Sequence, residues 1–441
     1  MSTNENKSFF EKLNSWIKNS ITVKLFSIGI IILLLLIPTF MVEDLIRDRQ
    51  TTSQSAIEEV GSKWGGNQII TGPIITIPYN GYIKNENNQI VPTTQYAHFL
   101  PDELIISGNA ATEKRYRGIY EIIAYNGKLS FKGKFPFPKP EEMNIDPKNI
   151  LWSEAFIQIG ITDMKGIKDN IKLTLANKNY LFNPGINSND VVESGVSTKI
   201  NLCDTLSDLT FNFDLNLNGS RQLYFTPLGK ETNVELASTW NSPSFDGSFL
   251  PDKRDITNEG FKAKWKVLHL NRNFPQQWKD GKYNVGDSSF GVNFMITVDH
   301  YQKSTRAAKY AVLIIALTFM GFFFVEIINK VRIHPFQYIL VGLAVCIFYA
   351  LLLALSEHVG FNFAYILSGV LVIGAITYYA KSIFDSKLPI ILLSSVLIII
   401  YGFIYVIIQL EDYALLMGSI GLFIVLVTIM HISRKIKWYN D

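Results

Sequence analysis

Residues 25–42 read LFSIGIIILLLLIPTFMV, an apolar stretch without a charged side chain. As a helix, it is long enough to cross a hydrocarbon core about 30 Å thick. In lipid, the backbone satisfies its hydrogen bonds only as a helix or a closed barrel. Basic residues precede the stretch but no A-x-A cleavage site follows it, so we expect an uncleaved signal-anchor that remains as the first transmembrane helix.

Five further apolar stretches lie close together in the last third of the chain, at residues 310–328, 336–355, 361–380, 388–408 and 413–432. The alternative is that these stretches form the buried helices of a soluble protein, and their number and length disfavour it. The sequence therefore predicts a polytopic α-helical membrane protein with six transmembrane helices. The last five form a bundle over residues 310–432, and a large domain is inserted between the first and second helices.

The short segments between the predicted helices differ in charge. The loops at residues 356–360 and 409–412 contain acidic residues but no Lys or Arg. Basic residues gather in the two tails (residues 1–24 and 433–441) and in the other loops: Lys7, Lys12, Lys18, Lys24, Lys330, Arg332, Lys381, Lys387, Arg434, Lys435 and Lys437. By the positive-inside rule, both termini are cytoplasmic and the segment 43–309 is extracytoplasmic.

The segment 43–309 begins with a polar stretch, residues 43–63, which we expect to continue the first transmembrane helix. After this stretch, the segment has the pattern of a β-rich domain. Residues 210–217 (TFNFDLNL) alternate between apolar and polar side chains, as a half-buried strand does. Asn80-Gly81, Asn126-Gly127 and Asp280-Gly281 indicate turns. Alternating runs on both sides of Asn126-Gly127 predict a hairpin over residues 121–131.

Composition and motifs give no sign of a reaction. The net charge is +3, which does not indicate a nucleic-acid partner. The two cysteines, Cys203 and Cys346, fall in different predicted compartments, so we expect no disulfide between them. The chain has no Walker loop, HExxH, CxxC or GxSxG motif, and its six histidines are isolated from one another. We therefore expect no catalytic residue, metal or cofactor, although paired carboxylates would leave no sequence signature.

Ionisable groups in or near lipid are candidate functional residues, because placing charge there is unfavourable. At the inner boundary these are Glu326 and His334. Glu326 stands four positions before Lys330, and an i,i+4 ion pair is the preferred explanation for it. His334 precedes Pro335, a residue that suits the first turn of a helix.

The interiors of the four later spans contain no Asp, Glu, Lys or Arg, residues that ion-coupled transporters place near the midplane. This absence disfavours a transporter. We expect the helices to make contact through small residues instead, namely Gly342, Cys346, Ser368, Gly369 and Gly374.

Residues spread over almost the whole chain match the pattern of one family. The matching segments include Trp64-Gly65, Gly72-Pro73, Arg115–Tyr120, Leu217–Ser220, Leu270–Arg272, Arg306–Tyr310, Leu317–Phe319, His334-Pro335, Leu355–His358 and Ala364-Tyr365. On these residues the chain resembles the CreD family of cell envelope integrity inner-membrane proteins. The resemblance implies a bacterial inner-membrane protein linked to a two-component envelope response and to tolerance of colicins and β-lactams. It implies no catalytic or binding residues.

The matched residues also suggest a candidate cluster at the outer membrane boundary, made of basic, acidic and aromatic side chains. Its members are Arg306, Lys309, Tyr310, Glu357, His358 and Tyr365. Such a cluster can bind a lipid head group or couple the β-rich domain to the bundle. The alternative is ordinary interfacial anchoring, which Tyr, Lys and Arg also provide.

The hydropathy and charge patterns predict a multi-pass membrane protein with an exported β-rich domain, and the resemblance implies that the membrane is the bacterial inner membrane and the domain periplasmic. We expect that domain to support envelope integrity or stress tolerance by binding an envelope component, with membrane lipids, a cell-wall precursor or another envelope protein as partner. A membrane-bound enzyme acting on lipid or glycan is the alternative function, and a transporter is the third.

Overall fold

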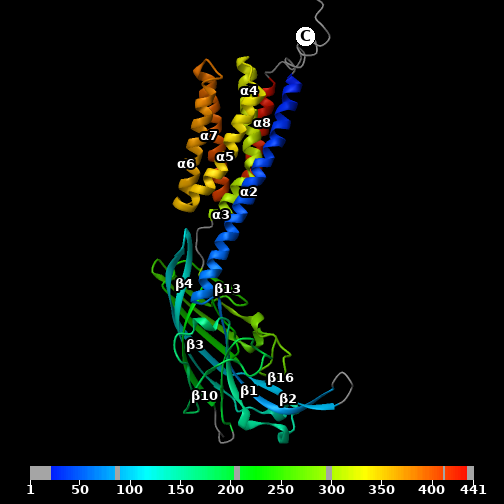
Figure 1. Cartoon of the computed structure of the whole chain (residues 1–441), viewed down its shortest axis with the longest axis vertical. Coiled ribbons are helices and arrows are strands. Elements are labelled where there is room, and N and C mark those ends of the chain that lie inside the picture. The colour runs from blue at the N-terminus through cyan, green and yellow to red at the C-terminus, as the bar shows by residue number, and fades with distance from the viewer. Residues whose placement is uncertain (1–20, 85–89, 203–208, 295–299, 411–412, 435–441) are drawn as a thin grey trace, which may run out of the picture. The chain divides into compact units, whose positions relative to one another are not determined.

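The computed structural model describes residues 21–84, 90–202, 209–294, 300–410 and 413–434, so that Cys203 lies outside the described residues. The chain divides into two compact units (Figure 1). A helical unit contains residues 1–52 and 298–441, and a β-rich unit contains residues 53–297.

The described residues contain six helices that are long and apolar enough to cross a membrane, one near the N-terminus and five in the last third. They are α2 (Ile21–Trp64), α4 (Ala311–Asn329), α5 (Pro335–Val359), α6 (Phe361–Ala380), α7 (Lys387–Gln409) and α8 (Ala414–Ser433), and the short helix α3 (His300–Lys309) precedes α4. The prediction of six apolar helices is confirmed. The continuation of the first helix through residues 43–63 is also confirmed, because α2 ends only at Trp64.

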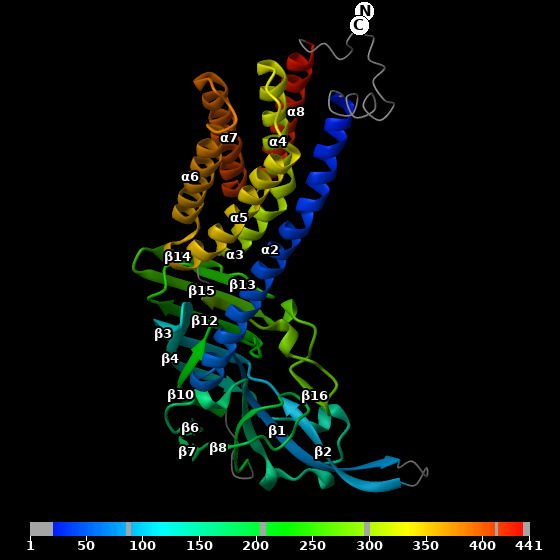
Figure 2. The same ribbon diagram turned by 45° about the horizontal axis from the view of Figure 1, so that its top comes forward.

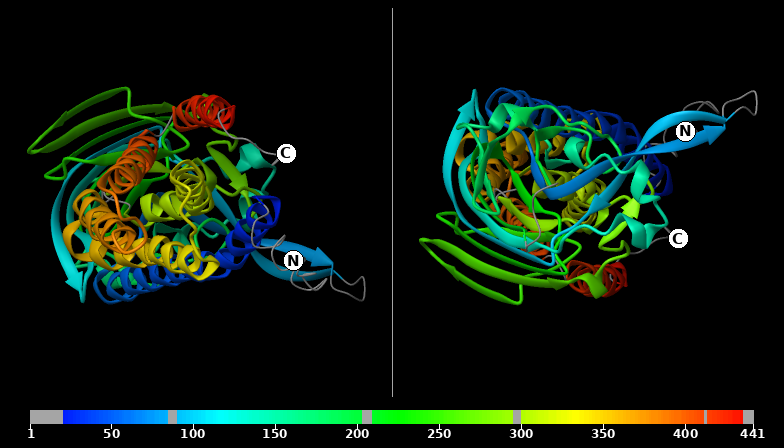
Figure 3. Two further views of the ribbon diagram at one scale, coloured as in Figure 1. Left: turned by 90° about the horizontal axis from the view of Figure 1, so that it is seen from above. Right: turned by 90° about the horizontal axis from the view of Figure 1, so that it is seen from below.

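Helices α4 to α7 stand side by side, as the end-on view in Figure 3 shows. Gly342 of α5 allows a close approach, because a Cβ at this position would overlap Leu35 of α2 and lie 2.9 Å from Phe319 of α4. Gly369 of α6 faces Tyr401 of α7 at an ordinary contact distance of 3.8 Å. The expected contact at Gly374 is wrong, since no atom lies within 4 Å of a Cβ built there.

The β-rich unit contains two sheets that share one hydrophobic core. One sheet has the order β13-β17-β11-β1-β5-β9-β8, with β2 paired to β1 and β16 paired to β2. Its strands are β1 (Gln68–Lys84), β2 (Ile90–Phe99), β5 (Phe156–Ile161), β8 (Asn183–Pro184), β9 (Gly195–Lys199), β11 (Gln222–Phe225), β13 (Pro243–Gly247), β16 (Gln277–Lys279) and β17 (Phe290–Phe294).

The second sheet has the order β14-β15-β12-β3-β4-β10-β6-β7, and Figure 2 shows its strands β14, β15, β12 and β3 next to one another. Its strands are β3 (Glu103–Arg117), β4 (Tyr120–Phe135), β6 (Lys172–Leu175), β7 (Lys178–Leu181), β10 (Leu209–Ser220), β12 (Glu231–Ser238), β14 (Lys253–Thr257) and β15 (Gly260–Leu268). Phe131 and Trp265 of this sheet and Phe225 and Phe290 of the other are among the largest fully buried side chains of the chain.

Strand β10 confirms the predicted half-buried strand, because its side chains alternate between buried and exposed along residues 209–216. The hairpin expected at Asn126-Gly127 is wrong. Strand β4 runs unbroken through these residues and pairs with β3 on one side and β10 on the other. The turn lies instead at Gly118, whose φ of +60° suits glycine.

The turn expected at Asn80-Gly81 is wrong for the same reason, since β1 continues through it in register with β2. Asp280-Gly281 does form a turn, with φ +58° at Asp280 directly after β16. Turn dipeptides therefore predicted turns only where the neighbouring strands did not continue to pair.

We predict that Gly342→Leu lowers the free energy of unfolding by about 1–3 kcal/mol, because the new side chain must displace Leu35 and Phe319. Gly374→Leu is the matched control on a neighbouring helix and should be nearly neutral. Thermal unfolding of the purified chain in detergent measures both. Equal losses in the two variants would contradict close packing at Gly342.

Candidate functional site

Glu326, near the end of α4, lies in a buried polar network. The residue is 5% exposed. Its Oε1 pairs with the Lys24 ammonium and accepts a hydrogen bond from the Ile333 backbone N–H at 3.0 Å. Its Oε2 accepts from the Tyr338 hydroxyl at 3.0 Å. The carboxylate is therefore well satisfied, and it joins α2, α4 and α5.

The ion pair expected between Glu326 and Lys330 is wrong. Helix α4 ends at Asn329, and Lys330 has the left-handed conformation with φ +53°, so the i,i+4 geometry of a continuing helix is lost. The partner is Lys24, which is 302 residues away in sequence.

His334 serves as the N-cap of α5. Its Nδ1 accepts from the Phe336 backbone N–H at 3.2 Å, while Gln337 Oε1 accepts from the His334 backbone N–H at 2.8 Å. The imidazole is exposed. This arrangement agrees with Pro335 in the first turn of the helix and indicates a capping role.

In the predicted outer-boundary cluster, Glu357 and Tyr365 are hydrogen-bonded to residues outside the cluster. The Tyr301 hydroxyl of α3 donates to Glu357 Oε1 at 2.9 Å, whereas His358 is exposed. Arg306 is half-buried, Lys309 is exposed, and Tyr310 precedes α4 as its N-cap residue. Tyr365 is buried inside the helical unit, where its hydroxyl donates to the Tyr401 backbone oxygen at 2.9 Å.

Three polar residues of α3, α6 and α7 were also missed in the sequence. Lys303 Nζ donates to Gln409 Oε1 at 3.1 Å, and Gln409 Nε2 donates to Asn362 Oδ1, which links α3, α7 and the start of α6. A lysine, a glutamine and an asparagine separated by dozens of residues form no motif, so only the packing of the helices reveals them.

The β-rich unit contains a buried hydroxyl–imidazole–carboxylate series that the sequence also did not indicate. Thr76 Oγ1 lies 3.0 Å from His98 Nδ1, and His98 Nε2 lies 3.2 Å from Asp190 Oδ2. The hydrogen bond with His98 holds the pKa of Asp190 below its ordinary value. Thr76 and His98 are fully buried cross-strand partners on β1 and β2, so the hydroxyl is closed to a substrate.

The residues that the structure describes contain no group of three or more His, Cys, Asp or Glu suited to hold a metal ion. Because the Thr76 hydroxyl is buried, the Thr76–His98–Asp190 series is best described as a hydrogen-bonded connection between β1, β2 and the segment that precedes β9.

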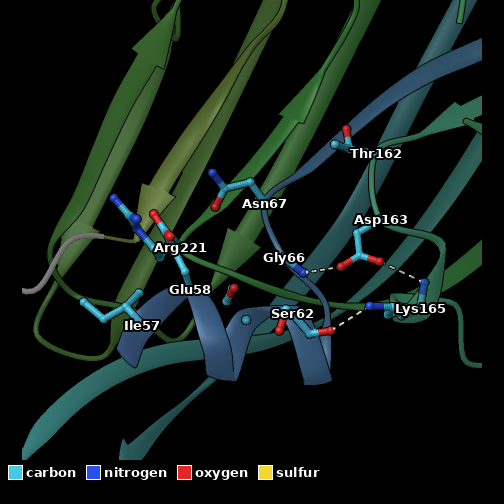
Figure 4. Close-up of a pocket in the computed structure, with 11 residues that line it drawn as sticks. Ile57, Glu58, Ser62, Gly66, Asn67, Thr162, Asp163, Lys165 and Arg221 are labelled. Atoms are coloured by element: carbon cyan, nitrogen blue, oxygen red, sulfur yellow. Dashed lines mark hydrogen bonds between the residues drawn. The ribbon is translucent and has the colours of Figure 1, made fainter. Parts of the chain in front are cut away.

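An open groove of about 450 Å³ lies in the β-rich unit beside the last turns of α2 (Figure 4). Its lining comes from α2, from the α2–β1 connection, from the segment between β5 and β6, and from the end of β10 with the β10–β11 connection. The lining residues are Ile57, Glu58, Gly61, Ser62, Gly66, Asn67, Thr162, Asp163, Lys165, Ser220 and Arg221.

Asp163 and Lys165 form hydrogen bonds between the two walls of the groove. Asp163 accepts hydrogen bonds from the backbone N–H groups of Gly66 at 2.9 Å and Lys165 at 3.0 Å. Lys165 Nζ donates to the Ser62 backbone oxygen at 3.2 Å. These bonds, drawn dashed in Figure 4, connect the end of α2 to the wall after β5.

Arg221, Glu58 and Asn67 are exposed, and their side chains make no hydrogen bond or ion pair with any described residue. Figure 4 shows Arg221 and Glu58 on one side of the groove and Asp163 with Lys165 on the other. A guanidinium and an amide without protein partners can bind the oxygen atoms of a phosphate, carboxylate or hydroxyl group.

Arg221 has φ +62°, a left-handed conformation that costs a non-glycine residue about 1–2 kcal/mol. Its backbone is fixed, because its N–H donates to Ile123 O at 3.1 Å and its C=O accepts from the Phe294 N–H at 2.6 Å. Glycine or asparagine would suit this connection better. Residues held in such conformations cluster at functional sites, which makes Arg221 the leading functional candidate of the β-rich unit.

Comparison with known proteins gives two matches over nearly the whole chain. The family model described as inner membrane protein CreD matches residues 20–439. The inner membrane protein CreD of Escherichia coli (strain K12) is 33% identical over 434 residues, which cover 96% of this chain and 95% of that protein.

We predict that Glu326→Ala lowers the free energy of unfolding by about 3 kcal/mol, because it leaves the Lys24 charge and the Tyr338 hydroxyl without their acceptor. The double variant Lys24→Met with Glu326→Leu should recover most of this loss, since it removes both charges. Unfolding followed by tryptophan fluorescence in detergent measures the difference. A double variant as unstable as Glu326→Ala would contradict the pairing.

Proposed function

Because this chain belongs to the CreD family of inner membrane proteins, we propose that it is a multi-pass envelope protein whose β-rich unit binds an envelope component on the periplasmic side. The proposed orientation, with both termini in the cytoplasm, is supported by the basic residues of the tails and of alternate loops. Binding at the β-rich unit then supports the integrity of the cell envelope under stress.

The observation that carries the proposal is the Arg221 guanidinium at the rim of an open groove, where it has no hydrogen-bond or ion-pair partner among the described residues. Arginine forms paired hydrogen bonds to phosphate and carboxylate oxygens, and a planar guanidinium loses little freedom when it does so. The ligand class is therefore a phosphate- or carboxylate-bearing envelope molecule, such as a lipid head group or a cell-wall precursor. Asn67 adds an amide that can bind hydroxyl groups of a glycerol or a sugar.

The shape of the groove favours binding over catalysis. Active sites that stabilise charged transition states exclude water, which strengthens their electrostatic interactions. Here the lining residues Glu58, Asn67 and Arg221 are exposed, and the carboxylate of Asp163 already accepts two backbone hydrogen bonds.

We predict that Arg221→Asn weakens ligand binding without destabilising the fold, because asparagine tolerates the left-handed conformation. The variant should lose at least about tenfold in affinity, while its thermal stability stays equal or rises. Native mass spectrometry of the full chain measures retention of added phosphatidylglycerol and of a polyprenyl-diphosphate-linked sugar, which distinguishes the two ligand sources.

Arg254→Asn is the matched control, since Arg254 is an exposed arginine on the edge strand β14. It should leave binding unchanged. If Arg221→Asn retains both ligands as the wild type does, or if both arginine variants lose them equally, the groove is not the binding site.

The proposed orientation has its own test. Protease added to spheroplasts should cleave within residues 53–297, whereas inside-out vesicles should protect this unit. The opposite pattern would refute the assignment of both termini to the cytoplasm.

A further inference from the structure

The groove at Arg221 presents charges of both signs to the solvent. Glu58 and Arg221 lie on the same side of it in Figure 4. Both are exposed, and within the part of the chain that the structure describes they form no ion pair with each other or with another residue. The exposed Asn67 adds an amide, which both donates and accepts hydrogen bonds. A ligand therefore meets a guanidinium, a carboxylate and an amide.

Two hydroxyl groups of the lining are already bonded to the backbone. The Ser62 hydroxyl donates to the Glu59 backbone oxygen at 2.8 Å. The Thr162 hydroxyl accepts from the Ile69 N–H at 3.1 Å and donates to the Ile69 oxygen at 3.3 Å. Recognition of a ligand thus falls mainly to Glu58, Asn67 and Arg221.

A guanidinium and a carboxylate that share one side of a groove without pairing suit a ligand that carries both charges. Arg221 can bind a carboxylate or phosphate group, and Glu58 can bind an ammonium group. A ligand with only an anionic group would place it near the like charge of Glu58, which is unfavourable. The volume of about 450 Å³ is in the range of small-ligand sites.

Such a ligand has two sources in a cell envelope. One is the head group of phosphatidylethanolamine in the bilayer, and the other is a water-soluble peptide with a free carboxylate and a free amino group. Both present an anionic group and an ammonium group, so the charges of the groove do not separate them. The position of the groove along α2 does.

Helix α2 measures how far the groove lies from the hydrocarbon. The apolar stretch of α2 ends at Val42, and the acidic Glu43 and Asp44 follow directly, so the hydrocarbon boundary lies at this point. The groove is lined by four residues between Ile57 and Ser62 of the same continuous helix. At a rise of about 1.5 Å per residue, they lie about 22–30 Å beyond Val42 along the axis.

The head groups of a bilayer occupy a much thinner layer, about 5–8 Å on each side of the hydrocarbon. A helix tilt of about 40°, the upper end of the usual range, still leaves the α2 wall of the groove about 17 Å from the hydrocarbon. The phosphate of a bilayer lipid therefore falls short of this wall, whereas a soluble peptide reaches it freely.

We propose that the groove binds a water-soluble peptide with a free carboxylate and a free amino group, as in the peptide portion of a cell-wall precursor, and not the head group of a bilayer lipid. Arg221 binds the carboxylate, Glu58 binds the ammonium group, and Asn67 bonds to a peptide group. This inference rests on the proposed function and identifies which of its ligand sources the groove serves.

Calorimetric titration of the full chain in phosphatidylcholine nanodiscs tests the two charge contacts. The probe is an N-acetylated, lysine-containing tetrapeptide with a free carboxyl terminus. Amidation of its carboxylate, or acetylation of its lysine, should each weaken binding to the wild type by at least about tenfold. Amidation should have little further effect on Arg221→Asn, and lysine acetylation little further effect on Glu58→Gln, because in each variant the partner of that group is already lost.

Asp48→Asn is the matched control, because it removes an exposed carboxylate of α2 that does not line the groove. It should bind all three peptides as the wild type does. If the wild type does not bind the peptide, or if Arg221→Asn and Glu58→Gln remain as sensitive to the two modifications as the wild type, the inference is overturned.

Addition of phosphatidylethanolamine to the nanodiscs distinguishes the two sources. We expect the affinity for the peptide to stay unchanged. Competition between this lipid and the peptide, or Arg221-dependent retention of the lipid in native mass spectrometry without any peptide binding, would overturn the inference and leave the groove as a lipid site. If Arg221→Asn loses neither ligand, the groove itself is refuted, and the proposed function with it.

Discussion

The absence of water inside a lipid bilayer is the constraint on which the rest of this structure depends. Backbone groups there must bond within their own segment, so each apolar stretch forms a helix. The same constraint acts on side chains. Glu326 is found inside the helical unit only together with Lys24, Tyr338 and the Ile333 amide, and the Tyr365 hydroxyl reaches a backbone oxygen of another helix.

In the β-rich unit, buried backbone groups also need hydrogen-bond partners, but strands find these partners only in neighbouring strands. Several of its buried polar side chains are bonded to each other or to the backbone. His98 lies between Thr76 and Asp190. Arg272, whose pKa burial lowers to about 10, donates to the backbone oxygens of Phe274 and Leu228.

One charged residue of the β-rich unit stands out. At the groove, Arg221 keeps an unfavourable backbone conformation while its side chain has no partner in the described part of the chain. Its guanidinium is exposed to water and can bind the oxygen atoms of a ligand from outside the chain.

The sequence by itself determined the six apolar helices, the β-rich character between the first two, and the half-buried alternation of β10, because hydropathy and its period report the surroundings of each residue locally. Only the tertiary structure decided which residues meet. Strand pairing on both sides carried β4 straight through Asn126-Gly127. Helix packing paired Glu326 with Lys24 instead of Lys330, and it buried Tyr365, whose hydroxyl donates to the Tyr401 backbone oxygen. The left-handed conformation of Arg221 has no local signature, because it depends on hydrogen bonds to segments far apart in the chain.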